Sequence, residues 1–332
     1  MELSDLEQTI NSSFNIEIFD NNHCFLCGEL LTKNSRTEEH VYPRWLQRKY
    51  NLWNQKLRLL NKTLISYKEL KIPCCKHCNA HLGEAIEKPI ENAVSIGYDA
   101  LINLDKQIVF QWLCKLSYGV LYKEMNLRMN RANPSSGTIL AAEDLKEETT
   151  LLLFLRAILT GAAFDGCKPY SLIIFRIYDF ENVPFWLFDS PMIHAFFVRM
   201  GDIGIIANLM DNGVSEQVFM KDSQMSFLTN QPLHPVQFNE ICAKYNYKLH
   251  LMPVKTCYMF DLDDKGKPVQ VLGIATTIGD EGEWNQKDYA KCLTHFLKEW
   301  QIEFEMLYQD GGLVRTFLWS ADGSFVEKRC IE

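Results

Sequence analysis

Hydrophobic and polar positions divide the chain into three stretches of different character. From residue 24 to about 87, turn-forming and basic residues are dense and no long apolar period develops. From 91 to 165, apolar residues recur at helical spacing, most strongly over 108–125, which predicts a helix buried on most sides. From residue 171 onward, short runs rich in β-branched and aromatic residues, separated by Pro, Asp and Gly, predict strands.

The third stretch predicts alternating strands and helices. Four strands are expected first, and a helix over 235–245 follows them. The turn Asp263–Gly266 predicts a hairpin of two further strands, and the pattern over 285–308 predicts one long amphipathic helix. A short helix is also expected near the start of the chain, over 3–10. The expected strands are 171–178, 184–189, 193–201, 203–210, 255–262 and 268–276.

The length of 332 residues suits two domains of ordinary size. We expect an N-terminal module over 20–90 and a larger α+β domain over 91–332, helical in 91–165 and mixed in 170–332. Hydrophobic residues make up 47% and charged residues 23%, as in soluble globular proteins. No apolar run approaches the roughly 20 residues of a membrane span, and the acidic N-terminus has no signal-peptide core. We therefore expect a cytoplasmic protein.

Charge is unevenly distributed along the chain. The formal net charge is −8, yet residues 24–90 hold 12 lysines and arginines against 6 acidic residues. This basic segment on an acidic protein has the character of a phosphate-contacting surface. Within it, Arg44, Arg48 and Lys49 are candidates for contact with nucleic-acid phosphates.

Two Cys-x-x-Cys knuckles, Cys24–Cys27 and Cys75–Cys78, carry the strongest chemical signal. Four thiolates presented by two tight turns close a tetrahedral zinc site, which would be structural because no coordination position stays open. Cys74 is an alternative to Cys75, although only Cys75 has the two-residue spacing to Cys78. His23, His77 and His81 are further alternatives as ligands.

A second group of residues offers oxygen and imidazole ligands. Glu39 and His40 are adjacent, so on a strand a local bend is needed for both to serve one site. Asn79 follows the last cysteine, and Glu87 lies a little over two helical turns further on. Glu39, Asn79 and Glu87 would suit Mg²⁺ or Mn²⁺, and His40 has the pKa to take a proton from water.

The order of these motifs resembles the HNH endonucleases of the ββα-metal, treble-clef class. The matching segments are CFLC, EHVYPRWL and CKHCN followed by a helix with a glutamate. The resemblance implies that Glu39 is a metal ligand and His40 the general base, and Asn79 and Glu87 match positions of the helix ligand. The histidine common after the last cysteine is Gly83 here.

The resemblance leaves two assignments open. The third metal ligand is Glu87, Glu84 or His81, and the middle asparagine of the family name is Asn61 or Asn79.

We therefore expect a metal-dependent endonuclease with structural Zn²⁺ and catalytic Mg²⁺ or Mn²⁺, acting on DNA rather than RNA. Nucleases of similar architecture serve bacterial mobile elements or antiviral defence, an analogy of architecture alone. The C-terminal domain would select substrate, gate the nuclease, or bind a protein partner or a second copy of the chain. One rival hypothesis is a treble-clef zinc module that binds nucleic acid or protein without cutting. Another is a protein whose function lies in the C-terminal domain, with the zinc knuckle as a staple.

Overall fold

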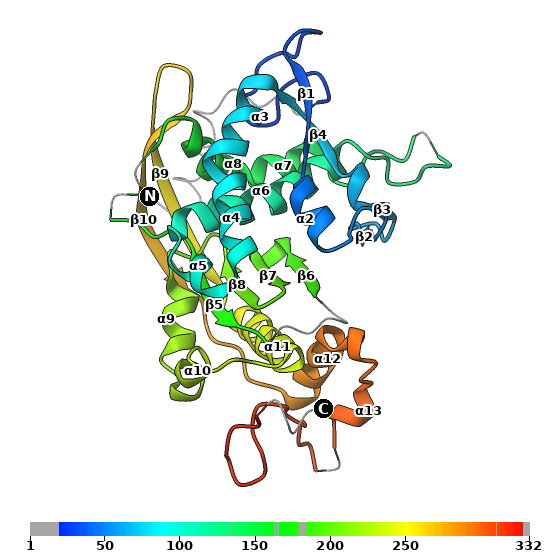
Figure 1. Ribbon diagram of the computed structural model, residues 1–332, viewed down its shortest axis with the longest axis vertical. Coiled ribbons are helices and arrows are strands. Elements are labelled where there is room, and N and C mark those ends of the chain that lie inside the picture. The colour runs from blue at the N-terminus through cyan, green and yellow to red at the C-terminus, as the bar shows by residue number, and fades with distance from the viewer. Residues whose placement is uncertain are drawn as a thin grey trace. The chain divides into compact units, whose positions relative to one another are not determined.

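The computed structural model describes residues 20–133, 135–162, 164, 166–178, 184–309 and 311–327 of the chain. Helices and strands are mixed, as an α+β protein requires (Figure 1). The helix expected over 3–10 lies outside the described residues. The chain forms two compact units, whose limits differ from the expected division at residue 90. The first unit consists of Met1–Ile96, Asn103–Lys168 and Cys257–Ala275, and the second of Gly97–Ile102, Pro169–Thr256 and Thr276–Glu332.

An antiparallel hairpin forms the centre of the knuckle region in the first unit. Strand β1 (Arg36–His40) pairs with β4 (Lys71–Cys75), so that His40 lies opposite Lys71. Helix α3 (Lys76–Leu82) begins at the residue after β4, and this gives the order strand, strand, helix. Between the two strands the chain forms α2 (Arg44–Lys49) and a small hairpin of β2 (Lys56–Arg58) with β3 (Leu64–Ser66).

Helix α3 continues through a π-helical turn, Gly83–Glu87, into α4 (Lys88–Ile96). A π-helical turn fits an extra residue into the helix and is frequently found at functional sites. The predicted apolar helix is α6 (Lys106–Met125), whose N-terminus is capped by the Asp105 carboxylate, which accepts from the Gln107 N–H at 2.9 Å.

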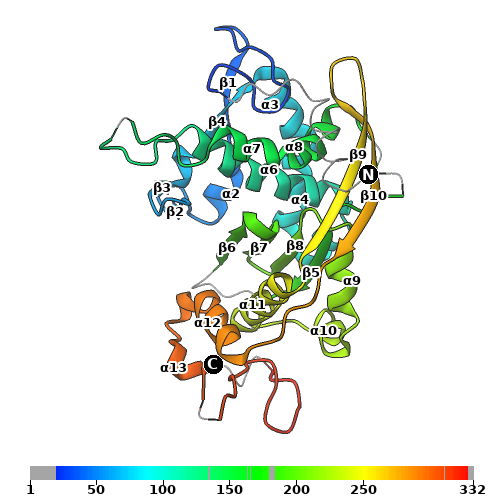
Figure 2. The same cartoon turned by 180° about the vertical axis from the view of Figure 1, so that it is seen from behind.

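Helix α6 is the packing centre of the first unit, as both views of the chain show (Figures 1 and 2). It contacts β4, the π-helical turn, α4, α7 (Ala142–Glu147) and α8 (Thr149–Arg156). Most of its side chains are buried, as the apolar pattern predicts. No helix in the described part of the chain is both long and apolar enough to cross a membrane.

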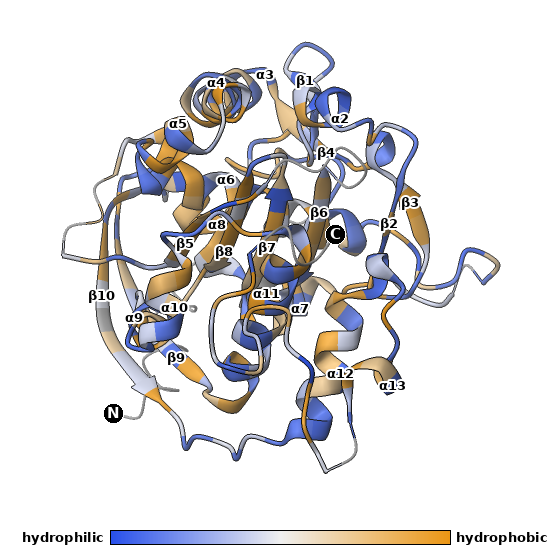
Figure 3. Cartoon of the chain, turned by 60° about the horizontal axis from the view of Figure 1, so that its bottom comes forward, coloured by the Kyte–Doolittle hydropathy of each residue, from blue (hydrophilic) through white to orange (hydrophobic). Residues whose placement is uncertain are grey.

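The second unit contains a four-stranded antiparallel sheet in the order β5-β8-β7-β6, and its strands agree with the four expected from the sequence. Most residues of these strands are hydrophobic (Figure 3), and the aromatic side chains of this region pack in the core of the unit. The strands are β5 (Ser171–Arg176), β6 (Phe185–Ser190), β7 (Ala195–Met200) and β8 (Ile203–Asn208), and the helices α5 (Tyr98–Ile102), α9 (Val214–Met220), α10 (Ser223–Leu228), α11 (Pro235–Leu251), α12 (Gln286–Phe296) and α13 (Phe304–Leu307).

The last expected hairpin and the last expected helix have different outcomes. Strands β9 (Val254–Leu262) and β10 (Pro268–Ile278) pair, and the Gly266 N–H closes the predicted turn on the Asp263 carbonyl at 2.9 Å. The prediction of a single helix over 285–308 was wrong. The helix stops after Phe296, and Gln301 has a φ of 54°, a backbone conformation that no α-helix can continue through.

Gly119 allows α6 to approach the end of β1 closely. A Cβ at this position would lie 2.9 Å from a methyl carbon of the fully buried Val41, which follows His40. A Cβ at Gly83, which has helical backbone angles, would meet nothing within 4 Å.

We expect opposite effects when these two glycines are replaced. Gly119→Ala should lower the free energy of unfolding by about 1 kcal/mol, because overpacking outweighs the gain in helix propensity. Gly83→Ala should raise it by about 0.5–1 kcal/mol, because the propensity gain meets no clash. Denaturant titration of both variants measures the difference, and stabilisation by Gly119→Ala would show that α6 does not press on Val41.

Candidate functional site

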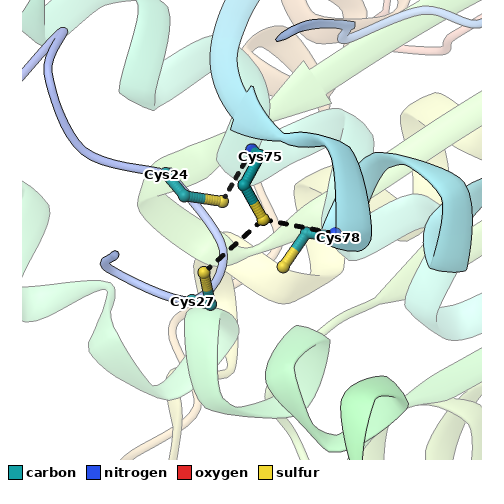
Figure 4. A group of neighbouring side chains, drawn as sticks. All are labelled: Cys24, Cys27, Cys75 and Cys78. Atoms are coloured by element: carbon teal, nitrogen blue, oxygen red, sulfur yellow. Dashed lines mark hydrogen bonds between the residues drawn. The ribbon is translucent and has the colours of Figure 1, made fainter. Parts of the chain in front are cut away.

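The four knuckle cysteines meet at one point. The sulfur atoms of Cys24, Cys27, Cys75 and Cys78 all lie within 4.8 Å of one another (Figure 4). Four sulfurs at this spacing could hold a metal ion such as zinc, and this confirms the predicted set, with Cys75 and not Cys74 as the partner of Cys78. Figure 4 shows the side chains converging from the loop of the first knuckle and from the start of α3.

Backbone contacts hold the first knuckle, Cys24–Cys27, against the rest of the unit. The Phe25 N–H donates to the Pro73 carbonyl on β4 at 2.9 Å. The buried Arg156, at the end of α8, donates from Nε to the Leu26 carbonyl at 2.5 Å. The sulfur cluster therefore joins the loop of the first knuckle to the junction of β4 and α3, which is distant from it in the sequence.

Hydrogen bonds to sulfur favour negative charge in the cluster. The Cys75 N–H lies 3.3 Å from the Cys24 sulfur, and the Cys78 N–H lies 3.3 Å from the Cys75 sulfur. Hydrogen bonds from Cys27, Cys74 and Cys78 hold the pKa of the Cys24 thiol well below its usual range, and the same contacts with Cys24 raise the pKa of Cys27 and Cys78. Negative charge in the cluster is therefore favoured at Cys24. Thiolates are the form in which cysteine binds metal.

The histidines considered as ligands lie elsewhere. His23 forms a 2.7 Å contact from Nδ1 to the Asp20 carboxylate, and His81 bonds the Ile158 carbonyl through Nε2 at 2.9 Å. His77 is exposed at the start of α3. Among the described residues, the sulfur cluster contains no histidine.

Glu39 and Glu87 come together, as the prediction of a second metal site requires, but a third residue lies between them. The ammonium of Lys115, from the middle of α6, forms ion pairs with one carboxylate oxygen of each glutamate. It also donates to the His40 carbonyl at 2.9 Å. The carboxylates therefore do not fit a divalent ion in this arrangement, because a cation already lies at the point where they converge.

Sequence analysis missed Lys115, although the sequence contains a signal for it. The residue lies within the apolar run 108–125, and its side chain is 0% exposed. A fully buried lysine requires anionic partners. The candidate partners in the sequence were Glu39 and the glutamates after the second knuckle, Glu84 and Glu87.

Burial and charge oppose each other in this group. Burial raises the pKa of Glu39 to about 7, with Lys115 opposing the shift and Glu87 adding to it. Burial alone would lower the pKa of Lys115, but the two carboxylates outweigh it and raise that pKa, which keeps the ammonium charged.

His40 is a buried, uncharged base at the end of β1. The residue is 7% exposed, and its Nε2 has no hydrogen-bond partner among the described residues. Burial, and then the charges of Arg44 and Lys71, lower its pKa to about 4. Its ring lies beside Trp53, with the two ring centres 6.2 Å apart.

Asn79 forms its hydrogen bonds away from the glutamate pair. Its Nδ2 donates to the Thr37 hydroxyl at 3.2 Å and to the Glu38 carbonyl at 3.3 Å, which ties α3 to β1. The alternative middle asparagine, Asn61, donates to the Met129 carbonyl from the β2–β3 turn. Of the two, only Asn79 contacts the hairpin that carries Glu39 and His40.

The other candidate for the third ligand, Glu84, is exposed and pairs with Lys88 at 3.4 Å. Glu87 is therefore the one of the three candidates that the structure places beside Glu39.

A basic pocket of about 520 Å³ lies next to the His40 end of the hairpin. Asn54, which follows Trp53, is part of its wall, and Lys123 of the wall donates to the Lys71 carbonyl, opposite His40, at 3.0 Å. Four cations and one carboxylate line the pocket, which suits a polyanion. The lining residues are Asn54, Lys56, Leu64, Ile65, Ser66, Lys68, Glu69, Lys123, Leu127 and Arg131.

The phosphate contacts expected from the sequence lie on α2. Arg44, Arg48 and Lys49 are exposed there, although the Lys49 ammonium already donates to the Val94 carbonyl at 2.9 Å. The pocket cations Lys123 and Arg131 were not among the expected contacts, because they follow the knuckle region in the sequence.

Two neighbouring cysteines provide a matched test of the metal centre. Cys75→Ser should abolish the binding of zinc, which we expect at about one ion per chain, because it removes one of four thiolates. Cys74→Ser should retain it, since the Cys74 sulfur is outside the cluster although it lies 3.9 Å from the Cys24 sulfur. Elemental analysis of the purified chains measures the metal content. Zinc lost from both variants, or from neither, would contradict the ligand set.

Comparison of the chain with protein-family profiles, with curated proteins and with solved structures finds no match. The function of this chain therefore has to be inferred from the site.

Proposed function

We propose that this chain is an endonuclease of the HNH type that hydrolyses phosphodiester bonds, with DNA as the expected substrate. The observation that carries the proposal is the environment of His40, a buried and uncharged imidazole. Its strand partner Lys71 accepts a hydrogen bond from Lys123, which lines the basic pocket. The Nε2 of His40 lacks a hydrogen-bond partner among the described residues. A buried polar atom in this condition costs about 1–3 kcal/mol. Because Nε2 has no exposed surface, a water molecule would reach it only after substrate binding shifts the side chains that cover it.

The proposed reaction uses His40 as the general base. Nε2 takes a proton from the water molecule, the water oxygen forms a bond to phosphorus, and the ester P–O bond breaks. The leaving oxygen takes a proton from solvent. The low pKa of His40 keeps Nε2 free to accept a proton at neutral pH.

The basic pocket would hold the phosphate backbone beside this base. Lys56, Lys68 and Arg131 are separate in the sequence and face one pocket with Lys123. Their charges would attract the nucleic-acid backbone and offset the charge that develops on the phosphate oxygens. Arg44 and Arg48 on α2 would extend the contact along the backbone.

The metal at the cysteines would have a structural role. A zinc ion with four thiolate ligands has no open coordination position, so it would hold the hairpin and α3 in place without contacting the substrate. The predicted Mg²⁺ or Mn²⁺ would have to bind between Glu39 and Glu87, and the Lys115 ammonium already occupies that position. The hydrolysis proposed here therefore uses His40 and the pocket cations alone.

A second candidate function is binding of nucleic acid without cutting. Lys115 favours it, because its ammonium lies between Glu39 and Glu87, where the catalytic metal of a nuclease was expected. In either case the second unit would select substrate or bind a partner or a second copy. A cytoplasmic role in bacterial defence or in a mobile element is inferred only by analogy with nucleases of similar architecture.

Replacing His40 tests the nuclease proposal. His40→Ala should reduce plasmid cleavage by about 10²–10⁴-fold, the usual contribution of a general base. Binding of the same DNA, measured by gel shift, should be retained because the basic pocket is unchanged. His250→Ala is the matched control, because His250 is exposed on α11 in the second unit.

The outcomes separate the two functions. Equal cleavage by wild type and His40→Ala would exclude His40 as the base. Binding of DNA by the wild type with no cleavage under any condition would favour the binding module.

A further inference from the structure

The lysine between the two glutamates has the surroundings that a metal ion would have. Its Nζ contacts two carboxylate oxygens, from Glu39 and Glu87, and one carbonyl oxygen, from His40. Carboxylate and carbonyl oxygens are the ligands that Mg²⁺ and Mn²⁺ take in proteins. An ammonium group has three N–H donors, and here each has one oxygen acceptor.

The three oxygens come from two separate segments, while the cation comes from a third. Glu39 and the His40 carbonyl belong to β1, Glu87 ends the π-helical turn, and Lys115 projects from α6. The side chains of α6 around Lys115 are buried in the core of the first unit, so the packed core opposes movement of the ammonium away from the carboxylates. A divalent ion would have to displace it against charge repulsion.

Solvent access also distinguishes this group from an open metal site. The Lys115 side chain is 0% exposed, and the side chains of Glu39 and Glu87 are 8% and 19% exposed. A substrate phosphate cannot reach an ammonium with no exposed surface. Lys115 thus acts on the fold and on the charge of the two carboxylates, and it is a positioning residue.

We propose that Lys115 is the resident cation of the Glu39–Glu87 pair and closes a site that would otherwise bind Mn²⁺ or Mg²⁺. The wild-type chain then binds no divalent ion there, and removal of the lysine side chain creates the metal site. A second consequence rests on the function proposed above: DNA cleavage by the wild type needs no added Mg²⁺ or Mn²⁺.

Titration with Mn²⁺, followed by electron paramagnetic resonance on the zinc-loaded full chain, tests the first consequence. Wild type should show no saturable Mn²⁺ site that depends on Glu87. Lys115→Ala leaves two carboxylates and an empty volume, so it should gain one site, and saturating Mn²⁺ should raise its Tm by about 4 °C or more.

Two further variants are the matched controls. Lys115→Met removes the charge but fills the volume, so it should gain no Mn²⁺ site. Lys115→Ala combined with Glu87→Gln should lose the site that Lys115→Ala gains. A Mn²⁺ site in the wild type that Glu39→Gln or Glu87→Gln abolishes would overturn the inference. Failure of a folded Lys115→Ala chain to bind Mn²⁺ would do the same, and if that variant does not fold, the wild-type titration alone decides.

Cleavage assays in buffer freed of Mg²⁺ and Mn²⁺ test the second consequence. Cleavage that proceeds there supports the inference, and cleavage that requires either ion overturns it. Absence of cleavage under all conditions, together with the expected Mn²⁺ results, overturns the proposed nuclease while the assignment of Lys115 stands.

Discussion

One buried ammonium group determines how the first unit is assembled. Lys115 reaches from the central helix α6 to two carboxylates and a carbonyl, and these belong to the first strand of the hairpin and to the helix that follows the second. None of these charges could be buried alone, because an isolated buried ion costs several kcal/mol. The hairpin, the π-helical turn and α6 are thus coupled: each supplies a charge that the others need.

The sulfur cluster and the ion pairs of Lys115 stabilise opposite ends of the hairpin. The cysteines join the loop before β1 to the end of β4 and to α3, at the Arg36 end of the hairpin. Lys115 binds Glu39 near the other end of β1. His40 follows immediately and lies opposite Lys71, whose carbonyl accepts from Lys123 of the basic pocket. Catalysis or binding at this end would therefore depend on residues that never contact the substrate.

The sequence predicts those parts of the site that depend on local spacing. The two Cys-x-x-Cys knuckles identified the sulfur cluster. Short runs rich in β-branched and aromatic residues, bounded by Pro, Asp and Gly, identified the four strands of the second unit. Lys115 follows Glu87 by 28 residues and Glu39 by 76, so no local pattern connects them. The one available signal was the cost of burying a lysine in an apolar helix, which implies anionic partners without identifying them.

Other differences arose because tertiary contacts decided the outcome. The residues of 285–308 have helical periodicity, yet α12 ends after Phe296, Gln301 has a positive φ, and a separate short helix, α13, follows. Asn79 has the position of a metal ligand in the sequence, but its amide donates from α3 to Thr37 and Glu38 on β1. In both cases the residue types were compatible with the prediction, and the neighbours determined what they do.

The most direct test of this account is a double-mutant cycle between Lys115 and Glu87, measured as the free energy of unfolding. If the ammonium is the cation of the pair, Lys115→Met and Glu87→Gln are each destabilising, and the double variant loses much less than their sum. The coupling should be about 2–3 kcal/mol, at the upper end of values for contacting residues. Additive effects within about 0.5 kcal/mol would contradict it, because they would show that the two residues do not share a charge interaction.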